Sequence, residues 1–283
     1  MFRRYTTILS VGFFIAAVSA VFGANQGDST DKYTLAYRFN KGDTLRWEVL
    51  QQLRIKTTVA GQSEVVDTIS LSTKLWTVID VDENGTALVE HKVEDVNMHK
   101  KQADKKDSSF NSKTDKDVPM EYEQVSSSLN IPLSKLSIAK TGEVMKKTQL
   151  VPYTAGTLDS KILIPLPKHE VAVGDEWKVP EEIQIPQANG TVKKIVIQKV
   201  FALESVKNGL AIVKYRTACL TPMDDPKLEV QVIDKLDFGR VELDLDTGHI
   251  LLQQADVQGS VLGFAGEMSS VDHRGRFVET MKK

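Results

Sequence analysis

Residues 44–59 read TLRWEVLQQLRIKTTV and carry an apolar side chain at almost every second position. The alternating apolar residues are Leu45, Trp47, Val49, Leu53, Ile55 and Val59. Such a period of two is typical of a half-buried strand, because successive side chains point to opposite faces. After Ala60-Gly61-Gln62, a second odd-numbered series runs through Val65, Ile69, Leu71, Leu75, Ile79 and Val81. We therefore predict two long antiparallel strands joined by a hairpin, with the odd-numbered apolar residues on one face.

Paired turn motifs suggest that the plan occurs twice along the chain. The pairs are Gly42-Asp43 with Gly174-Asp175, Asn84-Gly85 with Asn208-Gly209, and Thr141-Gly142 with Thr247-Gly248. Asn-Gly is a strong hairpin signal because both residues tolerate a positive φ. The fold class expected is mainly β, with antiparallel sheets in two similar halves, each with one short helix. The halves are 33–151 and 169–281, joined by an extended connector at 152–168, and they form either two domains or one continuous domain.

The two helices are expected from apolar stripes that begin near a proline. Tyr122, Val125 and Leu129 form the first stripe, and Leu228, Val232 and Leu236 form the second. Both spacings place the apolar side chains on one helical face, which would pack on the sheet. The polar stretch from His99 to Val118 reads as an exposed loop, with a candidate edge strand at Ser108–Asn111.

The first residues have the features of an export signal. Arg3 and Arg4 precede an apolar run from Ile8 to Val21, and small residues at Ala20 or Ala24 offer cleavage sites. The run is shorter than the roughly 20 residues that a membrane-spanning helix needs. Residues 1–24 are therefore predicted to be a signal peptide, with a retained membrane anchor as the alternative. Export would place the protein in the periplasm, in the cell envelope or outside the cell.

Composition excludes several classes of protein. The chain has 36 Lys and Arg against 38 Asp and Glu, a balance without the basic excess of a nucleic-acid binder. Its 1 Cys, Cys219, cannot form a disulfide within the chain. The sequence shows no nucleophile elbow, phosphate loop, dinucleotide fingerprint or metal-ligand spacing among its histidines. We accordingly expect no enzymatic activity, no cofactor, no metal and no nucleic-acid partner.

Four segments, in their order along the chain, resemble a family of exported bacterial proteins of unknown function that is abundant in planctomycetes. The segments are Tyr37–Thr44 (YRFNKGDT), Asp80–Ala87 (DVDENGTA), Phe110–Ser112 (FNS) and Val171–Trp177 (VAVGDEW). The resemblance implies an exported, mostly β protein. It implies no activity and no catalytic residues.

The leading interpretation is a non-enzymatic envelope or periplasmic protein that encloses a hydrophobic ligand. A curved antiparallel sheet covered by a helix can enclose an apolar cavity. Its expected lining residues are Leu45, Trp47, Leu53, Ile69, Leu71 and Leu75. The rival interpretation is a structural or interaction module with an envelope protein as partner, and the third is a hydrolase with a dispersed site. Trp76 falls on even parity, so it faces solvent, lies under a helix or belongs to a second buried face.

Overall fold

The computed structural model describes residues 31–103, 105–151, 163–187 and 190–282. The predicted signal peptide at 1–24 lies outside the described residues, as do positions 152–162 of the predicted connector. The described residues all belong to the unit Asp31–Lys283.

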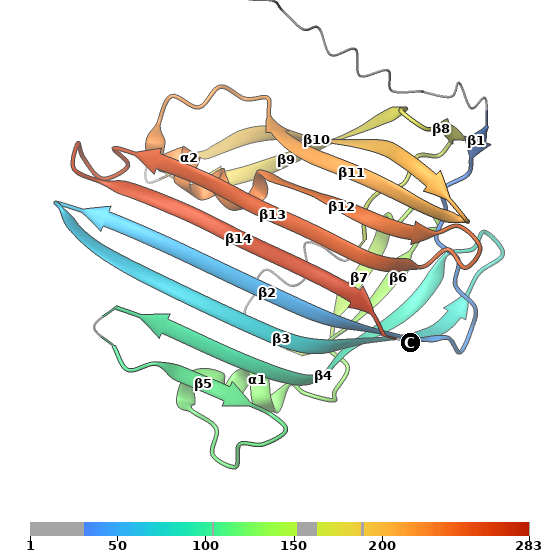
Figure 1. Cartoon of the computed structure of the whole chain (residues 1–283), viewed down its shortest axis with the longest axis horizontal. Coiled ribbons are helices and arrows are strands. Elements are labelled where there is room, and N and C mark those ends of the chain that lie inside the picture. Colours follow the sequence, from blue (N-terminus) through green and yellow to red (C-terminus); the bar gives the residue numbers. More distant parts are fainter. Residues whose placement is uncertain (1–30, 104, 152–162, 188–189, 283) are drawn as a thin grey trace, which may run out of the picture. The chain divides into compact units, whose positions relative to one another are not determined.

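A 12-stranded antiparallel sheet dominates the described chain, which confirms the mainly β prediction (Figure 1). The strand order is β7-β6-β4-β3-β2-β14-β13-β12-β11-β10-β9, and β5 pairs with β4 beside this path. The first seven strands are β1 (Lys32–Tyr33), β2 (Thr44–Val59), β3 (Gln62–Val81), β4 (Ala87–Gln102), β5 (Ser108–Asn111), β6 (Ser134–Ile138) and β7 (Val144–Gln149). The others are β8 (Val171–Ala172), β9 (Glu176–Pro186), β10 (Val192–Lys207), β11 (Leu210–Cys219), β12 (Asp237–Asp244), β13 (Ile250–Leu262) and β14 (Ser270–Met281). β1 and β8 form a separate pair.

Two short helical segments interrupt the strands, and both helix predictions are confirmed. The first joins η1 (Met120–Tyr122) to α1 (Glu123–Ser127), and the second joins α2 (Pro226–Val232) to η3 (Ile233–Lys235). The Asp225 side chain accepts a hydrogen bond from the Lys227 amide at 2.9 Å, so it satisfies one of the free donors at the start of α2. The candidate edge strand is also confirmed, as β5.

The β2–β3 hairpin corrects the expected parity. Val59 pairs with Gln62 across a two-residue turn, so odd residues of β2 lie opposite even residues of β3. Opposed residues share a face of the sheet. Ile69 and Leu71 therefore lie on the face opposite to Trp47, where their exposed fractions are 45% and 36%. Trp76 shares the face of Trp47, which we call the inner face, and the two rings meet edge-on at 5.3 Å.

The inner face curls around a core at one end of the strands. This core joins Leu136 of β6 with Phe201 of β10, although these strands lie close to opposite edges of the strand order. Segments 35–39 and 164–171 also contribute to it. The Tyr37 amide donates to the Lys140 carbonyl at 2.8 Å, and the Tyr37 hydroxyl donates to the Ile164 carbonyl at 3.0 Å. The two segments therefore fill the space that the curled sheet encloses.

Paired turn motifs match in some details and differ in others. The Asn40 amide donates to the Asp43 carboxylate, and the Ala172 amide donates to the Asp175 carboxylate, both at 2.8 Å. The Asn-Gly turns differ. Asn208 and Gly209 both have a positive φ in a two-residue turn, whereas the loop at Gly85 is longer and is closed by hydrogen bonds to the Asp82 side chain. The two-halves interpretation stays a prediction.

None of the helices in the described part of the chain has the length and apolar composition needed to cross a membrane.

Candidate ligand cavity

The inner face of β2 changes character along its length. Leu45, Trp47 and Val49 are buried, with exposed fractions of 8%, 3% and 3%. The next inner-face residues, from Gln51 to Thr57, are partly exposed. The same face therefore begins as packed core and continues as the wall of an open space.

That space is a cavity of about 1110 Å³ between the inner face and the two helical segments. Small-molecule pockets typically measure ~300–1000 Å³, so the cavity is large enough for a long-chain ligand. Strands β2, β3, β4, β9, β10, β12, β13 and β14 contribute to its wall. Val125 of α1 and Val230 of α2 line it as well. Representative apolar lining residues on the strands are Leu53, Ile55, Val96, Ile197, Val257 and Phe277.

The structure places the six expected lining residues in three different environments: the cavity wall, the closed core and the outer face. Leu53 lines the cavity from the inner face, and Ile69 is also a lining residue although it pairs with Gln52 and so belongs to the opposite face. Leu45 and Trp47 lie in the closed core. Leu71 and Leu75 lie on the outer face, the face opposite to Trp47, and are not among the described lining residues, because the two-residue turn reverses the parity between β2 and β3.

Most of the wall was missed by sequence reasoning because it comes from other parts of the chain. Gln51 of β2 pairs with Phe277 of β14, and Leu53 pairs with Gly275, which places the two strands side by side in the wall. The alternation in β13 gave a local signal, since Ala255, Val257 and Val261 recur at even spacing. No local pattern places β14 beside β2, because that pairing joins strands far apart in sequence.

A cluster of polar side chains from β10, β11 and β12 interrupts the apolar wall. The Asp237 carboxylate is 2% exposed and accepts hydrogen bonds from the Thr217 hydroxyl at 2.8 Å and the Tyr215 hydroxyl at 3.2 Å. The Lys199 ammonium lies 3.4 Å from the same carboxylate. Burial raises the pKa of Tyr215 well above its ordinary value, and the negative charge of Asp237 raises it further. Lys199 and Asp237 both line the cavity, so this cluster can meet a polar part of a ligand.

A second buried charge pair lies in the core of the inner face. Lys74 of β3 forms an ion pair with Glu279 of β14. The Lys74 ammonium lies 4.6 Å from the ring centroid of Trp47 and 4.8 Å from that of Trp76, within the range of cation–π attraction. Burial raises the pKa of the Glu279 carboxyl, and the charge of Lys74 opposes that rise. This pair is part of the fold's interior and does not line the cavity.

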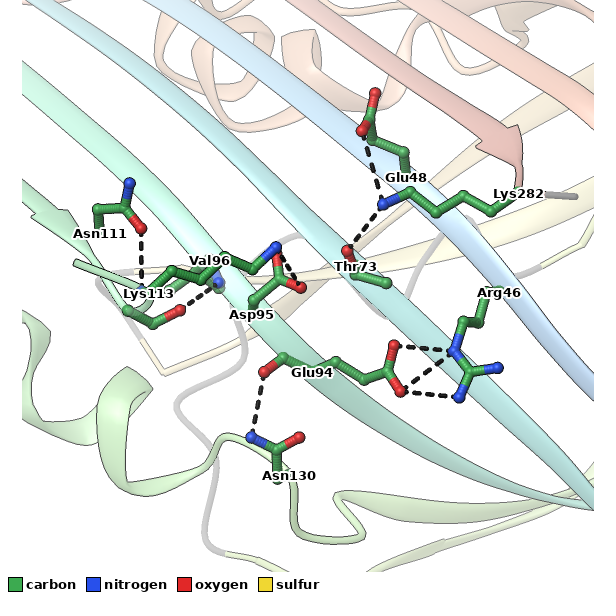
Figure 2. A network of polar contacts seen from close by, with 11 residues as sticks. Arg46, Glu48, Thr73, Glu94, Asp95, Val96, Asn111, Lys113, Asn130 and Lys282 are labelled. Atoms are coloured by element: carbon green, nitrogen blue, oxygen red, sulfur yellow. Dashed lines mark hydrogen bonds and ion pairs between the residues drawn. The ribbon is translucent and has the colours of Figure 1, made fainter.

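The outer face carries polar contacts between strands, one of which links β2 to β4 across β3 (Figure 2). The Arg46 guanidinium donates to both carboxylate oxygens of Glu94, with Nε–Oε2 at 3.0 Å and Nη2–Oε1 at 3.1 Å. Asn130 donates to the Glu94 carbonyl at 3.1 Å. Lys282 joins this face through Glu48 at 3.8 Å and through the Thr73 hydroxyl at 3.3 Å. The Arg46–Glu94 and Lys282–Glu48 contacts are solvent-exposed, whereas the Thr73 hydroxyl is buried, and we assign all of them a structural role.

Within the described residues, no group of three or more His, Cys, Asp or Glu side chains is placed to hold a metal ion. The polar groups at the cavity are arranged as ion pairs and hydrogen bonds.

No protein-family model matches the chain, and no curated protein matches it in sequence. Among solved structures, the chain is similar to one in the structure of lipid–protein interactions in lipovitellin, at a TM-score of 0.48 and 10% identity. The match covers 87% of this chain and 26% of that chain, so the present chain spans about a quarter of the length of the chain it matches. A likeness at this level carries no functional argument.

Proposed function

We propose that this protein binds a hydrophobic small molecule in the cavity between the inner face and the two helical segments. The observation that supports the proposal is the change along β2 from buried core at Val49 to a partly exposed apolar wall at Leu53 and Ile55. Apolar side chains that face an open space leave surface that a ligand can remove from water. A large concave site lined by apolar groups and a few convergent polar groups is the usual form of a small-molecule site.

The proposal also covers the location of the protein, which we propose to be exported. The basic pair Arg3-Arg4 and the apolar run from Ile8 to Val21 favour export to the periplasm, the envelope or the medium. Sequencing the amino terminus of the protein recovered from its host tests this. A start between Val21 and Asn25 supports export with cleavage, and a start at Met1 in the membrane fraction supports the retained anchor.

Binding is tested with the uncharged fluorescent hydrophobe N-phenyl-1-naphthylamine. We expect wild-type protein to enhance its fluorescence saturably. Ile55→Trp, which adds volume to the cavity wall, should weaken this binding by about tenfold, equivalent to ~1.4 kcal/mol. Leu71→Trp is the matched control, because Leu71 lies on the outer face and is 36% exposed. Absence of probe binding by the folded wild type contradicts the proposal.

An envelope interaction module is the second candidate, and strand β7 supports it. β7 ends the strand order in the described part of the chain, and all six of its residues are exposed. Met145 is 61% exposed on this strand. An edge strand can accept a strand from another chain. Absence of hydrophobic-probe binding by the folded wild type would favour this interaction-module function.

A further inference from the structure

The basic side chains that line the cavity share one property. Each Lys or Arg among the described lining residues lies within ion-pair distance of a carboxylate. The pairs are Lys100–Glu121 at 3.6 Å, Lys199–Asp237 at 3.4 Å, Lys235–Asp234 at 3.0 Å and Arg276–Asp256 at 2.6 Å. The acid Glu181 also lines the cavity. The wall therefore presents no Lys or Arg whose charge is left uncompensated.

The Lys199–Asp237 pair is the most enclosed of the four. The side chains of Lys199 and Asp237 are 23% and 2% exposed, whereas the other three lysine and arginine side chains are 39% exposed or more. The Asp237 carboxylate also holds the hydroxyls of Thr217 and Tyr215. Its orientation is thus fixed by several contacts, and with it the position of the Lys199 ammonium.

An ammonium group has three N–H donors, and one is sufficient for Asp237. The others can donate to a hydroxyl or carbonyl oxygen of a ligand. A carboxylate or phosphate placed at the same point would meet the negative charge of Asp237 a few ångströms away. It would also lose its own hydration without gaining an uncompensated cation, which is costly in an enclosed site. A cationic head group would meet the Lys199 charge.

From this arrangement we infer that the cavity selects an uncharged amphiphile, such as a long-chain alcohol or ester, whose oxygen accepts a hydrogen bond from Lys199. The inference rests on the proposed function, because it assigns the ligand class to the same cavity. It excludes ionised fatty acids and phosphorylated lipids as preferred ligands.

Displacement of N-phenyl-1-naphthylamine from the full chain by a matched series of 16-carbon ligands tests the inference. The series is hexadecanol, methyl palmitate, palmitate and hexadecyltrimethylammonium. At about pH 8 the palmitate carboxylate is ionised. We expect hexadecanol and methyl palmitate to bind at least about tenfold more tightly than either charged ligand, a difference of ~1.4 kcal/mol or more.

The Asp237→Asn variant tests the inference through an expected gain in affinity for palmitate relative to hexadecanol. It removes the negative charge, keeps an acceptor oxygen for Thr217 and leaves the Lys199 charge uncompensated. The ratio of palmitate to hexadecanol affinity should then rise by at least about tenfold. Asp67→Asn is the matched control, since Asp67 pairs with Arg54 on the outer face at 2.9 Å, and it should leave the ratio unchanged. If Asp237→Asn does not fold, Lys199→Gln should weaken hexadecanol binding relative to hexadecane.

The outcomes separate the two proposals. Palmitate that binds wild type as tightly as hexadecanol overturns the uncharged-ligand inference and leaves hydrophobic binding in place. An affinity ratio that Asp237→Asn does not change overturns the role of the Lys199–Asp237 pair and the inference built on it. Failure of every ligand and of the probe to bind overturns the proposed function and, with it, the inference.

Discussion

Lys74 and Glu279 form an ion pair across β2, although their own strands, β3 and β14, are not neighbours in the sheet. On β2, Trp47 lies opposite Lys74 and Val49 lies opposite Glu279. The Glu279 side chain is 2% exposed, and the Lys74 side chain is 14% exposed. The pair therefore connects β3 to β14 across β2, inside the core, by a single charged contact.

Removing one partner of this pair should be far more damaging than removing both. Glu279→Gln leaves the Lys74 charge buried without its counterion, and we expect a loss of about 3–5 kcal/mol in the free energy of unfolding. Lys74→Met combined with Glu279→Leu should be close to neutral, because no uncompensated charge remains. Urea unfolding measures both. Lys194→Met is the control, since the Lys194–Glu182 pair is exposed and should contribute about 1 kcal/mol or less. A double variant as unstable as Glu279→Gln would contradict this account.

The Glu279 carboxyl should also make the stability of the protein depend on pH. Burial raises the pKa of Glu279 in the folded state, so the folded protein holds this proton more tightly than the unfolded chain does. The stabilisation of the folded state that comes from this proton is therefore fully present below the ordinary pKa of 4.5. It is lost as the pH rises through the raised pKa of the folded state. The stability of wild type relative to the Lys74→Met/Glu279→Leu variant should fall as pH rises through that window. Equal pH dependence of the two proteins would show that the folded-state pKa of Glu279 is not raised.

Gly142 should tolerate a side chain less well than Gly85, although both have a φ of 81°. A Cβ atom on Gly142 would lie 2.6 Å from the Ile164 carbonyl oxygen and 2.6 Å from a Tyr37 ring carbon. On Gly85 it would meet only the Lys140 side chain, at 3.4 Å. We expect Gly85→Ala to cost about 1–2 kcal/mol from the positive φ and Gly142→Ala to cost ~1–3 kcal/mol more from the clash. Thermal and urea unfolding compare the two, and equal losses would argue against the close contact at Gly142.

Truncation of a leucine should distinguish the cavity wall from the closed core. Leu136 is 0% exposed in the core, and Leu136→Ala should cost about 2–5 kcal/mol because it leaves a void. Leu53 already faces the cavity, so Leu53→Ala should cost less and should change the affinity for N-phenyl-1-naphthylamine. Calorimetry and probe titration on both variants check the difference. A full core loss at Leu53 with unchanged probe binding would mean that Leu53 packs as core.

The sequence predicted those elements whose signal is local. Alternation from Leu45 to Ile55 gave the inner face of β2, and the stripe of Leu228 and Val232 gave the buried side of α2. The prediction that odd-numbered residues of both strands share one face was wrong from Ala60-Gly61 onward. The two-residue turn there pairs Val59 with Gln62, so odd-numbered residues of β2 share a face with even-numbered residues of β3. Apolar residues on β3 misled the interpretation further, since Ile69 and Leu71 are exposed on the outer face.

Only part of the candidate site could be predicted for the same reason. Leu53 was found from the alternation of its own strand. The cluster of Lys199 and Asp237 was not, because these residues come from β10 and β12, with β11 between them in the strand order. Charged residues on a strand are normally assigned to its solvent face, and only their pairing in three dimensions reveals that they are enclosed.

The placement of β14 between β2 and β13 has a consequence for the order in which the chain can assemble on the ribosome. β2 and β3 emerge early and pair with each other, but the second neighbour of β2 is made last among the described strands. Trp47 of β2 pairs with Met281 of β14, so the two strands lie near opposite ends of the described chain. Until β14 arrives, the nascent β2 has one unpaired edge, which is open to strands of other chains. Long-range closure of this kind slows folding, so we expect this edge of β2 to stay unpaired through most of the synthesis of the described strands.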